Sequence, residues 1–154
     1  MKIKNSIVAF ALLILTTTFA STISAQTKRT ASNNYDGVYK LYFKGRFKNF
    51  ANEIVVKSRG KNKLFVGFDL IHPYIVGGEE TVNMGETGGE AILKGNTAYF
   101  DNTDQFGNCK ITLKFVKPDT LVVTQETDGY SCAFGNNVTA RGTYKKSRAG
   151  TKPR

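Results

Sequence analysis

The chain has little of the chemistry that most catalytic sites use. Its 154 residues include no tryptophan, two cysteines and a single histidine, His72. One histidine excludes a histidine-based catalytic triad and a multi-histidine metal site within one chain. Acidic residues could supply a glycosidase pair, but acids clustered among glycines are more typical of a solvated surface. We therefore expect a protein that is not an enzyme and holds no metal or cofactor.

Long hydrophobic runs are also scarce. The longest run, residues 7–15, follows Lys2 and Lys4 and falls short of the roughly 20 residues that cross a bilayer. Small and polar residues then lead to Ala25. This order is typical of a secretory signal peptide over residues 1–25. We expect a secreted or periplasmic protein without a transmembrane segment in its mature part.

The remainder is long enough for one domain and too short for two. Residues 26–34 are polar and basic and predict a flexible lead-in. The domain is expected over residues 35–146, and residues 147–154 form a basic tail. In an oxidising compartment, Cys109 and Cys132 predict one disulfide. Closing that loop would stabilise the fold by roughly 3 kcal/mol.

The composition favours sheet and turns, because valine, isoleucine, threonine and aromatic residues are frequent and no stretch shows helical periodicity. Alternating or continuous apolar patterns predict strands over residues 36–44, 54–57, 64–71, 91–93, 97–100, 111–115, 121–125 and 138–145. Between Pro73 and Gly89 the glycines interrupt the pattern, and only a weak edge strand over residues 81–84 is expected there.

Seven or eight short strands in series must hide their edges. Closure into a small antiparallel up-and-down barrel does this completely, and a two-sheet sandwich is the alternative. In a closed barrel the first and last strands are neighbours.

Charge is unevenly distributed along the chain, whose formal net charge is +10. Basic residues concentrate before residue 64 and after residue 108, and acids concentrate between them. Pairing of the first and last strands would gather the bases on one face. We expect that basic face to include Lys44, Arg46, Phe47, Lys48, Arg59, Lys61, Lys63, Arg141 and Lys145.

Phe47 and Phe50 lie among three cations, a combination suited to an anionic polymer or a headgroup layer. The alternative is that one ring folds back and closes the barrel end. For an exported protein the candidate polyanions are cell-wall polymer, lipopolysaccharide, acidic glycans and extracellular nucleic acid. Asn137 begins a glycosylation sequon, which has meaning only in a eukaryotic host.

Residues 132–145 carry the pattern Cys-Ala-Phe-Gly followed by Gly-Thr-Tyr-Lys. This segment resembles the ending of small exported bacterial proteins that are mostly of unassigned function, with Ala133 in place of the expected glycine. Size, signal peptide and cysteine pair also resemble the periplasmic inhibitors of c-type lysozyme, which are small barrels that insert a loop into the enzyme's cleft. That resemblance carries over no residue. Because c-type lysozymes are basic, such a partner would have to meet an acidic side of this protein, for which the acidic segment Gly77 to Glu90 is the candidate.

The leading hypothesis is an exported, non-enzymatic binding protein for an anionic envelope polymer or for a basic protein such as a lysozyme-like hydrolase. The alternative is a lipocalin-like carrier of a small apolar ligand. The interior of such a carrier would be lined by Tyr39, Leu41, Phe43, Val66, Phe68, Leu113, Phe115 and Tyr144. Large inward side chains can instead fill an eight-stranded barrel with a packed core.

Overall fold

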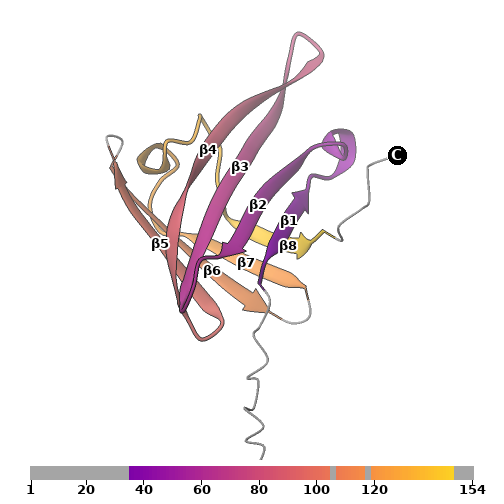
Figure 1. The fold of residues 1–154 in the computed structure, drawn as a ribbon. Coiled ribbons are helices and arrows are strands. Elements are labelled where there is room, and N and C mark those ends of the chain that lie inside the picture. Colours follow the sequence, from indigo (N-terminus) through magenta and orange to yellow (C-terminus); the bar gives the residue numbers. More distant parts are fainter. Residues whose placement is uncertain (1–34, 105–106, 117–118, 148–154) are drawn as a thin grey trace, which may run out of the picture. The chain divides into compact units, whose positions relative to one another are not determined.

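The sheet closes on itself as an eight-stranded antiparallel barrel in which each strand pairs with the next along the chain (Figure 1). The computed structural model describes residues 35–104, 107–116 and 119–147. The elements are β1 (Gly37–Tyr42), η1 (Gly45–Phe47), β2 (Ala51–Ser58), β3 (Lys63–Val76), β4 (Glu79–Lys94), β5 (Thr97–Asp104), β6 (Gly107–Val116), β7 (Thr120–Gln125), η2 (Tyr130–Cys132) and β8 (Gly142–Lys146). The predicted all-β barrel is confirmed.

Three segments predicted from the sequence belong to parts of the chain that the structure does not describe. The signal peptide over residues 1–25, the lead-in over 26–34 and the tail beyond Ser147 lie outside the described residues. Among the residues described, no helix is long and apolar enough to cross a membrane.

The barrel closes where β1 meets β8. The register joins Tyr39 to Lys146 and Lys40 to Lys145, and the backbone N–H of Ser147 extends the seam by donating to the carbonyl of Val38 at 2.7 Å. The expected pairing of the first and last strands is therefore confirmed. Two lysines lie side by side on the outer face of this seam, and Lys40 pairs in turn with Glu53 on β2. The hydrogen bond to Glu53 raises the pKa of Lys40.

Strand direction defines two ends of the barrel. At the upper end lie the β1–β2 connection (residues 43–50), the β3–β4 turn (77–78) and the β7–β8 connection (126–141). At the lower end lie the β2–β3 turn (59–62), the β4–β5 turn (95–96) and both limits of the described chain, Tyr35 and Ser147. Every second connection therefore reaches the same end.

Aromatic side chains close the core at both ends. Phe134, 5% exposed, enters the upper end and lies edge-on to Phe68, with ring centroids 6.3 Å apart. At the lower end, Tyr35 stacks on Phe115 with centroids 4.1 Å apart. The β7–β8 connection, rather than Phe47 or Phe50, thus supplies the ring that closes the upper end. Six of the eight residues considered as cavity lining belong to the buried core: Tyr39, Val66, Phe68, Leu113, Phe115 and Tyr144.

The segment expected to be irregular is the most regular hairpin of the barrel. β3 and β4 pair continuously from Lys63 and Ile92 to Val76 and Glu79, so the prediction of a weak strand over residues 81–84 is wrong. The prediction failed because glycines in this segment do not all interrupt a strand. Gly85 instead allows the Phe134 ring to approach β4 closely, since a Cβ at this position would lie 2.8 Å from the ring.

The last predicted strand is shorter than expected. β8 begins at Gly142, and Val138 and Ala140 are buried within the preceding connection. Their alternation reflects inward packing of a loop rather than sheet. The predicted disulfide is confirmed, since Cys109 on β6 is bonded to Cys132 in η2.

Two buried tyrosines make the free energy of unfolding depend on pH in the alkaline range. Burial, followed by the nearby charge of Asp119, raises the pKa of Tyr39 to about 12, and burial also raises the pKa of Tyr144. Their hydroxyls donate to the carbonyls of Tyr35 and Ala140 at 2.9 and 3.0 Å. The folded state therefore retains these protons to a higher pH than the unfolded chain does.

We expect the free energy of unfolding to lose this contribution as the pH rises from about 10, the unfolded tyrosine pKa, towards 12. Tyr39→Phe combined with Tyr144→Phe should lower stability at neutral pH, because two hydrogen bonds are lost, but should flatten the alkaline decline. Urea unfolding at a series of pH values measures both effects, and Tyr130→Phe, at an exposed position, is the control. Equal alkaline slopes for the wild type and the double variant would contradict the assignment.

Candidate functional site

The lower end of the barrel is strongly basic. Lysines and arginines occur there in the β2–β3 turn, beside the β4–β5 turn and at the ends of β6 and β8. We call this set the basic end: Lys57, Arg59, Lys61, Lys63, Lys94, Lys114, Lys145 and Lys146. The acidic side chains described at the same end are Asp36, Glu90 and Asp119. The excess of positive charge creates a potential that attracts polyanions.

Several of these bases are held by aromatic rings or oxygen atoms. Arg59 lies over Phe65, Lys94 over Tyr99 and Lys146 over Tyr39, with cation-to-centroid distances of 5.6, 5.6 and 5.8 Å. These contacts reduce side-chain freedom without cancelling charge.

Two further bases interact with oxygen atoms of side chains. Lys63 pairs with Glu90 at 2.8 Å, and Lys145 donates to the hydroxyl of Thr120 at 2.6 Å. The Lys63 pair is exposed, so it contributes little to stability.

The residues predicted to form one basic face lie at both ends of the barrel. Arg59, Lys61, Lys63 and Lys145 belong to the basic end. The others lie at the upper end, in the β1–β2 connection and before β8: Lys44, Arg46, Phe47, Lys48 and Arg141. Sequence reasoning missed Lys57, Lys94, Lys114 and Lys146, although the alternation of strand direction could have located them.

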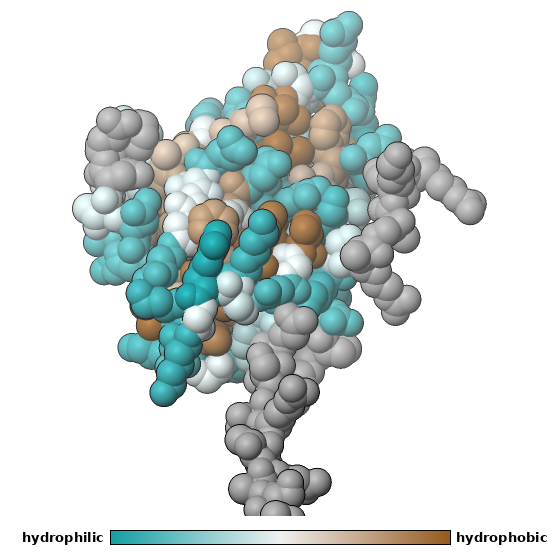
Figure 2. Space-filling model, viewed as in Figure 1, coloured by the Kyte–Doolittle hydropathy of each residue, from teal (hydrophilic) through white to brown (hydrophobic). Residues whose placement is uncertain are grey.

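The upper end carries a projecting arm. The pairing between β2 and β3 ends at Asp69, whereas β3 and β4 continue together to Val76 and Glu79. We define the arm as residues 70–85 (Figure 1). Hydrophobic residues gather over this hairpin in Figure 2, and Ile75 and Met84 are 39% and 65% exposed.

The arm has no basic residue of its own. Residues 64–93 contain no lysine or arginine, and Glu79 and Glu80 stand at the tip. Arg46 crosses to the tip from η1, where its Nε lies 3.2 Å from Glu80 Oε1 and its Nη2 donates to the Gly78 carbonyl at 3.0 Å. This exposed ion pair positions the β1–β2 connection beside the arm but leaves the hairpin itself acidic.

The β3 edge of the arm is protected from further strand pairing. The Ile71 N–H points towards β2, where the buried side chain of Asn52 accepts it at 2.8 Å. Two residues later, Pro73 points the same way along the strand and has no N–H to offer. This backbone edge therefore cannot serve as a continuous template for another strand.

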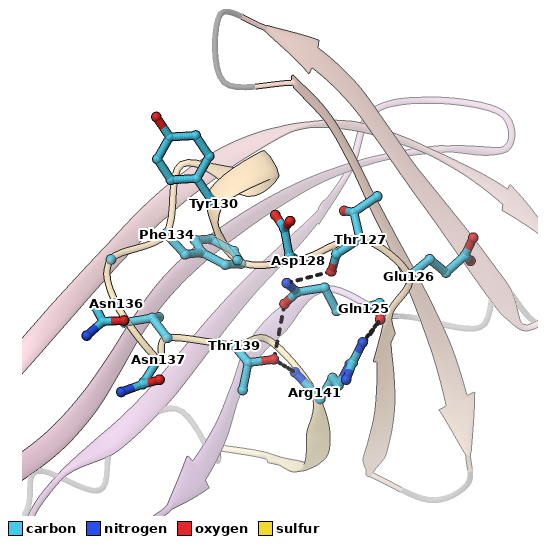
Figure 3. A pocket seen from close by; sticks show the side chains of 13 residues that line it. Gln125, Glu126, Thr127, Asp128, Tyr130, Phe134, Asn136, Asn137, Thr139 and Arg141 are labelled. Carbon is cyan, nitrogen blue, oxygen red and sulfur yellow. Dashed lines mark hydrogen bonds between the residues drawn. The ribbon is translucent and has the colours of Figure 1, made fainter.

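A buried glutamine organises the β7–β8 connection. Gln125 is 3% exposed, and its Nε2 donates to the Thr127 carbonyl at 3.0 Å. Its Oε1 accepts from the Ala140 N–H at 2.8 Å and from the Thr139 hydroxyl at 3.2 Å. Its own carbonyl accepts two hydrogen bonds from the Arg141 guanidinium, at 3.0 and 2.8 Å (Figure 3). One side chain and one carbonyl thus join the start of the connection to its end.

The middle of the connection is docked on β4. The Gly135 N–H donates to the Met84 carbonyl at 3.0 Å, and the Asn83 side chain donates to the Asn136 carbonyl at 2.8 Å. Ala133, which follows η2, adopts φ 59°, a left-handed conformation that favours glycine.

An open hollow of about 620 Å³ lies within this connection. Exposed polar side chains and one exposed aromatic ring surround it: Glu126, Asp128, Tyr130, Asn136, Asn137 and Arg141. The sequence prediction named Arg141 alone from this group. No sequence signal distinguished the hollow, because its residues come together only through the non-regular path of the connection (Figure 3).

Neither protein-family models, curated proteins nor solved structures match this chain. Its candidate sites therefore rest on its own geometry. Within the described ranges, no group of three histidine, cysteine, aspartate or glutamate side chains could hold a metal ion.

The docking of the connection depends on the absence of a side chain at Gly135. A Cβ there would lie 2.5 Å from the Met84 carbonyl oxygen, so Gly135→Ala must displace the connection from β4. We expect a loss of about 1–3 kcal/mol in the free energy of unfolding and faster amide exchange across residues 129–138. Urea unfolding and hydrogen exchange measure these changes.

Gly67→Ala is the matched control for this substitution. A Cβ at Gly67 would lie 3.4 Å from the Phe65 ring, which is an ordinary contact. The docking argument fails if Gly135→Ala leaves exchange in residues 129–138 as slow as the control does.

Proposed function

We propose that this chain is an exported, non-enzymatic binding protein that attaches through its basic end to an anionic polymer of the cell envelope. The observation that carries the proposal is the gathering of eight basic residues around one end of a small barrel, against three described acids. A polyanion that contacts several of these bases releases its own bound counterions, and this release drives association.

The connections of the barrel place the two kinds of charge at different ends. The acidic tip of the arm belongs to the opposite end, where it does not repel a polymer bound below.

The packed core of the barrel agrees better with a ligand bound at the outer surface than with a ligand carried inside. The aromatic residues Tyr35, Phe115 and Phe134 close the two ends, and the side chains considered for a ligand cavity pack mainly against one another. This arrangement favours surfaces outside the barrel over a lipocalin-like interior site.

A labelled heparin oligosaccharide, with uncharged dextran as the negative ligand, tests the proposal by fluorescence anisotropy. We expect binding that weakens as salt rises, and Arg59→Gln with Lys61→Gln should reduce affinity by about tenfold at 0.1 M salt and lower the salt slope by about two. The physical reason is the loss of two cationic contacts with the polymer.

Lys44→Gln with Lys48→Gln is the matched control, because it removes the same charge from the upper end. We expect it to change affinity by less than about twofold. An equal loss in both double variants, or binding that salt does not weaken, would contradict attachment through the basic end.

A second candidate function is insertion of the arm into the cleft of a basic protein such as a lysozyme-like hydrolase. The observation that favours it is a projecting hairpin with exposed Ile75 and Met84, two glutamates at its tip and no basic residue between positions 64 and 93. The architectural resemblance to periplasmic lysozyme inhibitors supports the same proposal.

Hydrolysis of cell walls by a c-type lysozyme tests this candidate. An excess of the protein should slow turnover, and Glu79→Gln with Glu80→Gln should weaken that inhibition by about tenfold because complementary charge is lost. Glu90→Gln, at the lower end, is the control. Unchanged turnover at high molar excess of the wild type would dispose of the candidate.

A further inference from the structure

The β7–β8 connection is held by more contacts than closing the barrel requires. Phe134 alone supplies the ring that enters the upper end. Yet the connection is also fixed by the Cys109–Cys132 disulfide, by Gln125 at both ends and by Gly135 on β4. A long non-regular connection that is held this firmly presents its outward side chains in set positions, as binding loops do.

The outward side chains surround the hollow with planar hydrogen-bonding groups. Asn136 and Asn137 contribute amides, Asp128 a carboxylate and Arg141 a guanidinium. The Nε and one amino group of Arg141 are used on the Gln125 carbonyl, which turns the Nη1 side of the guanidinium away from β7. Such groups offer paired donors and acceptors at fixed angles.

Tyr130 adds a flat apolar surface beside these groups. It is 74% exposed, the largest value among the exposed large hydrophobic side chains, and it stands above Phe134 at the rim (Figure 3). The hollow, at about 620 Å³, lies within the range of about 300–1,000 Å³ that small-molecule sites occupy. An aromatic face at the rim, with planar polar groups elsewhere around the hollow, matches a short chain of pyranose rings, which have apolar C–H faces and edges of hydroxyl groups.

The charges of the hollow favour a ligand without net charge. Asp128 accepts the Ser131 N–H at 2.7 Å, and this hydrogen bond lowers the pKa of its carboxyl, so the group is ionised at neutral pH. Glu126, whose carboxylate accepts the hydroxyl of Thr112 on β6 at 2.8 Å, is a second carboxylate at the edge of the hollow. An anionic ligand would meet two carboxylates against the one guanidinium of Arg141.

We propose that the hollow of the β7–β8 connection is a binding site for a neutral oligosaccharide, with Tyr130 at the rim stacking on one sugar ring and Asn136, Asn137 and Arg141 hydrogen-bonding to hydroxyl groups of the other rings. This site is separate from the basic end and does not depend on polymer attachment there.

Amide chemical shifts of the ¹⁵N-labelled protein test this site, with chitotriose and cellotriose as neutral probes and a heparin tetrasaccharide as the anionic one. We expect at least one neutral probe to shift amides within residues 126–141, and Tyr130→Ala and Asn136→Ala each to weaken that binding by about fivefold. Both side chains are exposed, so neither substitution should disturb folding, which thermal unfolding checks.

Tyr42→Ala is the matched control, since Tyr42 is 59% exposed on β1 and does not line the hollow. It should bind the neutral probe as the wild type does. The proposal is overturned if neither neutral probe moves these amides, if only the heparin probe does, or if Tyr130→Ala binds as tightly as Tyr42→Ala.

Discussion

Pairing of β1 with β8 is the constraint on which the rest of the structure depends. The seam is short, with register pairs at Tyr39 and Lys40, but it turns an open sheet with two exposed edges into a closed wall. Closure with an even number of strands returns both limits of the described chain to one end. The basic end follows directly from this topology, because Lys145 and Lys146 on the last strand join the turn residues Arg59 and Lys61 there.

The parts of the fold that could be predicted are those in which the local pattern and the tertiary environment agree. Inward Ile111 and Leu113 alternate with polar residues on β6, and their hairpin with β7 was correctly predicted. β4 could not be predicted because its glycines serve tertiary contacts: Gly85 makes room for Phe134, and Gly88 lies against the backbone of β3. A glycine that permits close approach and a glycine that breaks a strand are identical in sequence.

The candidate sites show a different limit. Charge counts along the chain identified Arg59 and Lys44 as similar, yet one strand lies between them, so they occupy opposite ends. In an up-and-down barrel, bases in consecutive connections lie at opposite ends. Bases in every second connection lie at the same end. The hollow could not be predicted in this way. It depends on hydrogen bonds between Gln125 and both Thr127 and Ala140, which join the start and the end of the connection and leave no pattern in the sequence.

Distance separates the charges at the tip of the arm from those of the basic end. The 14 residues of β3 span about 46 Å at about 3.3 Å per residue, which is several times the Debye length of about 8 Å at physiological salt. Charges at the tip of the arm therefore do not screen the basic end. The same separation orients the molecule: at an anionic surface the basic end is attracted and the acidic tip repelled, so the arm and the hollow face away from that surface. In such a field the basic end meets the surface, while the tip of the arm stays exposed to solvent.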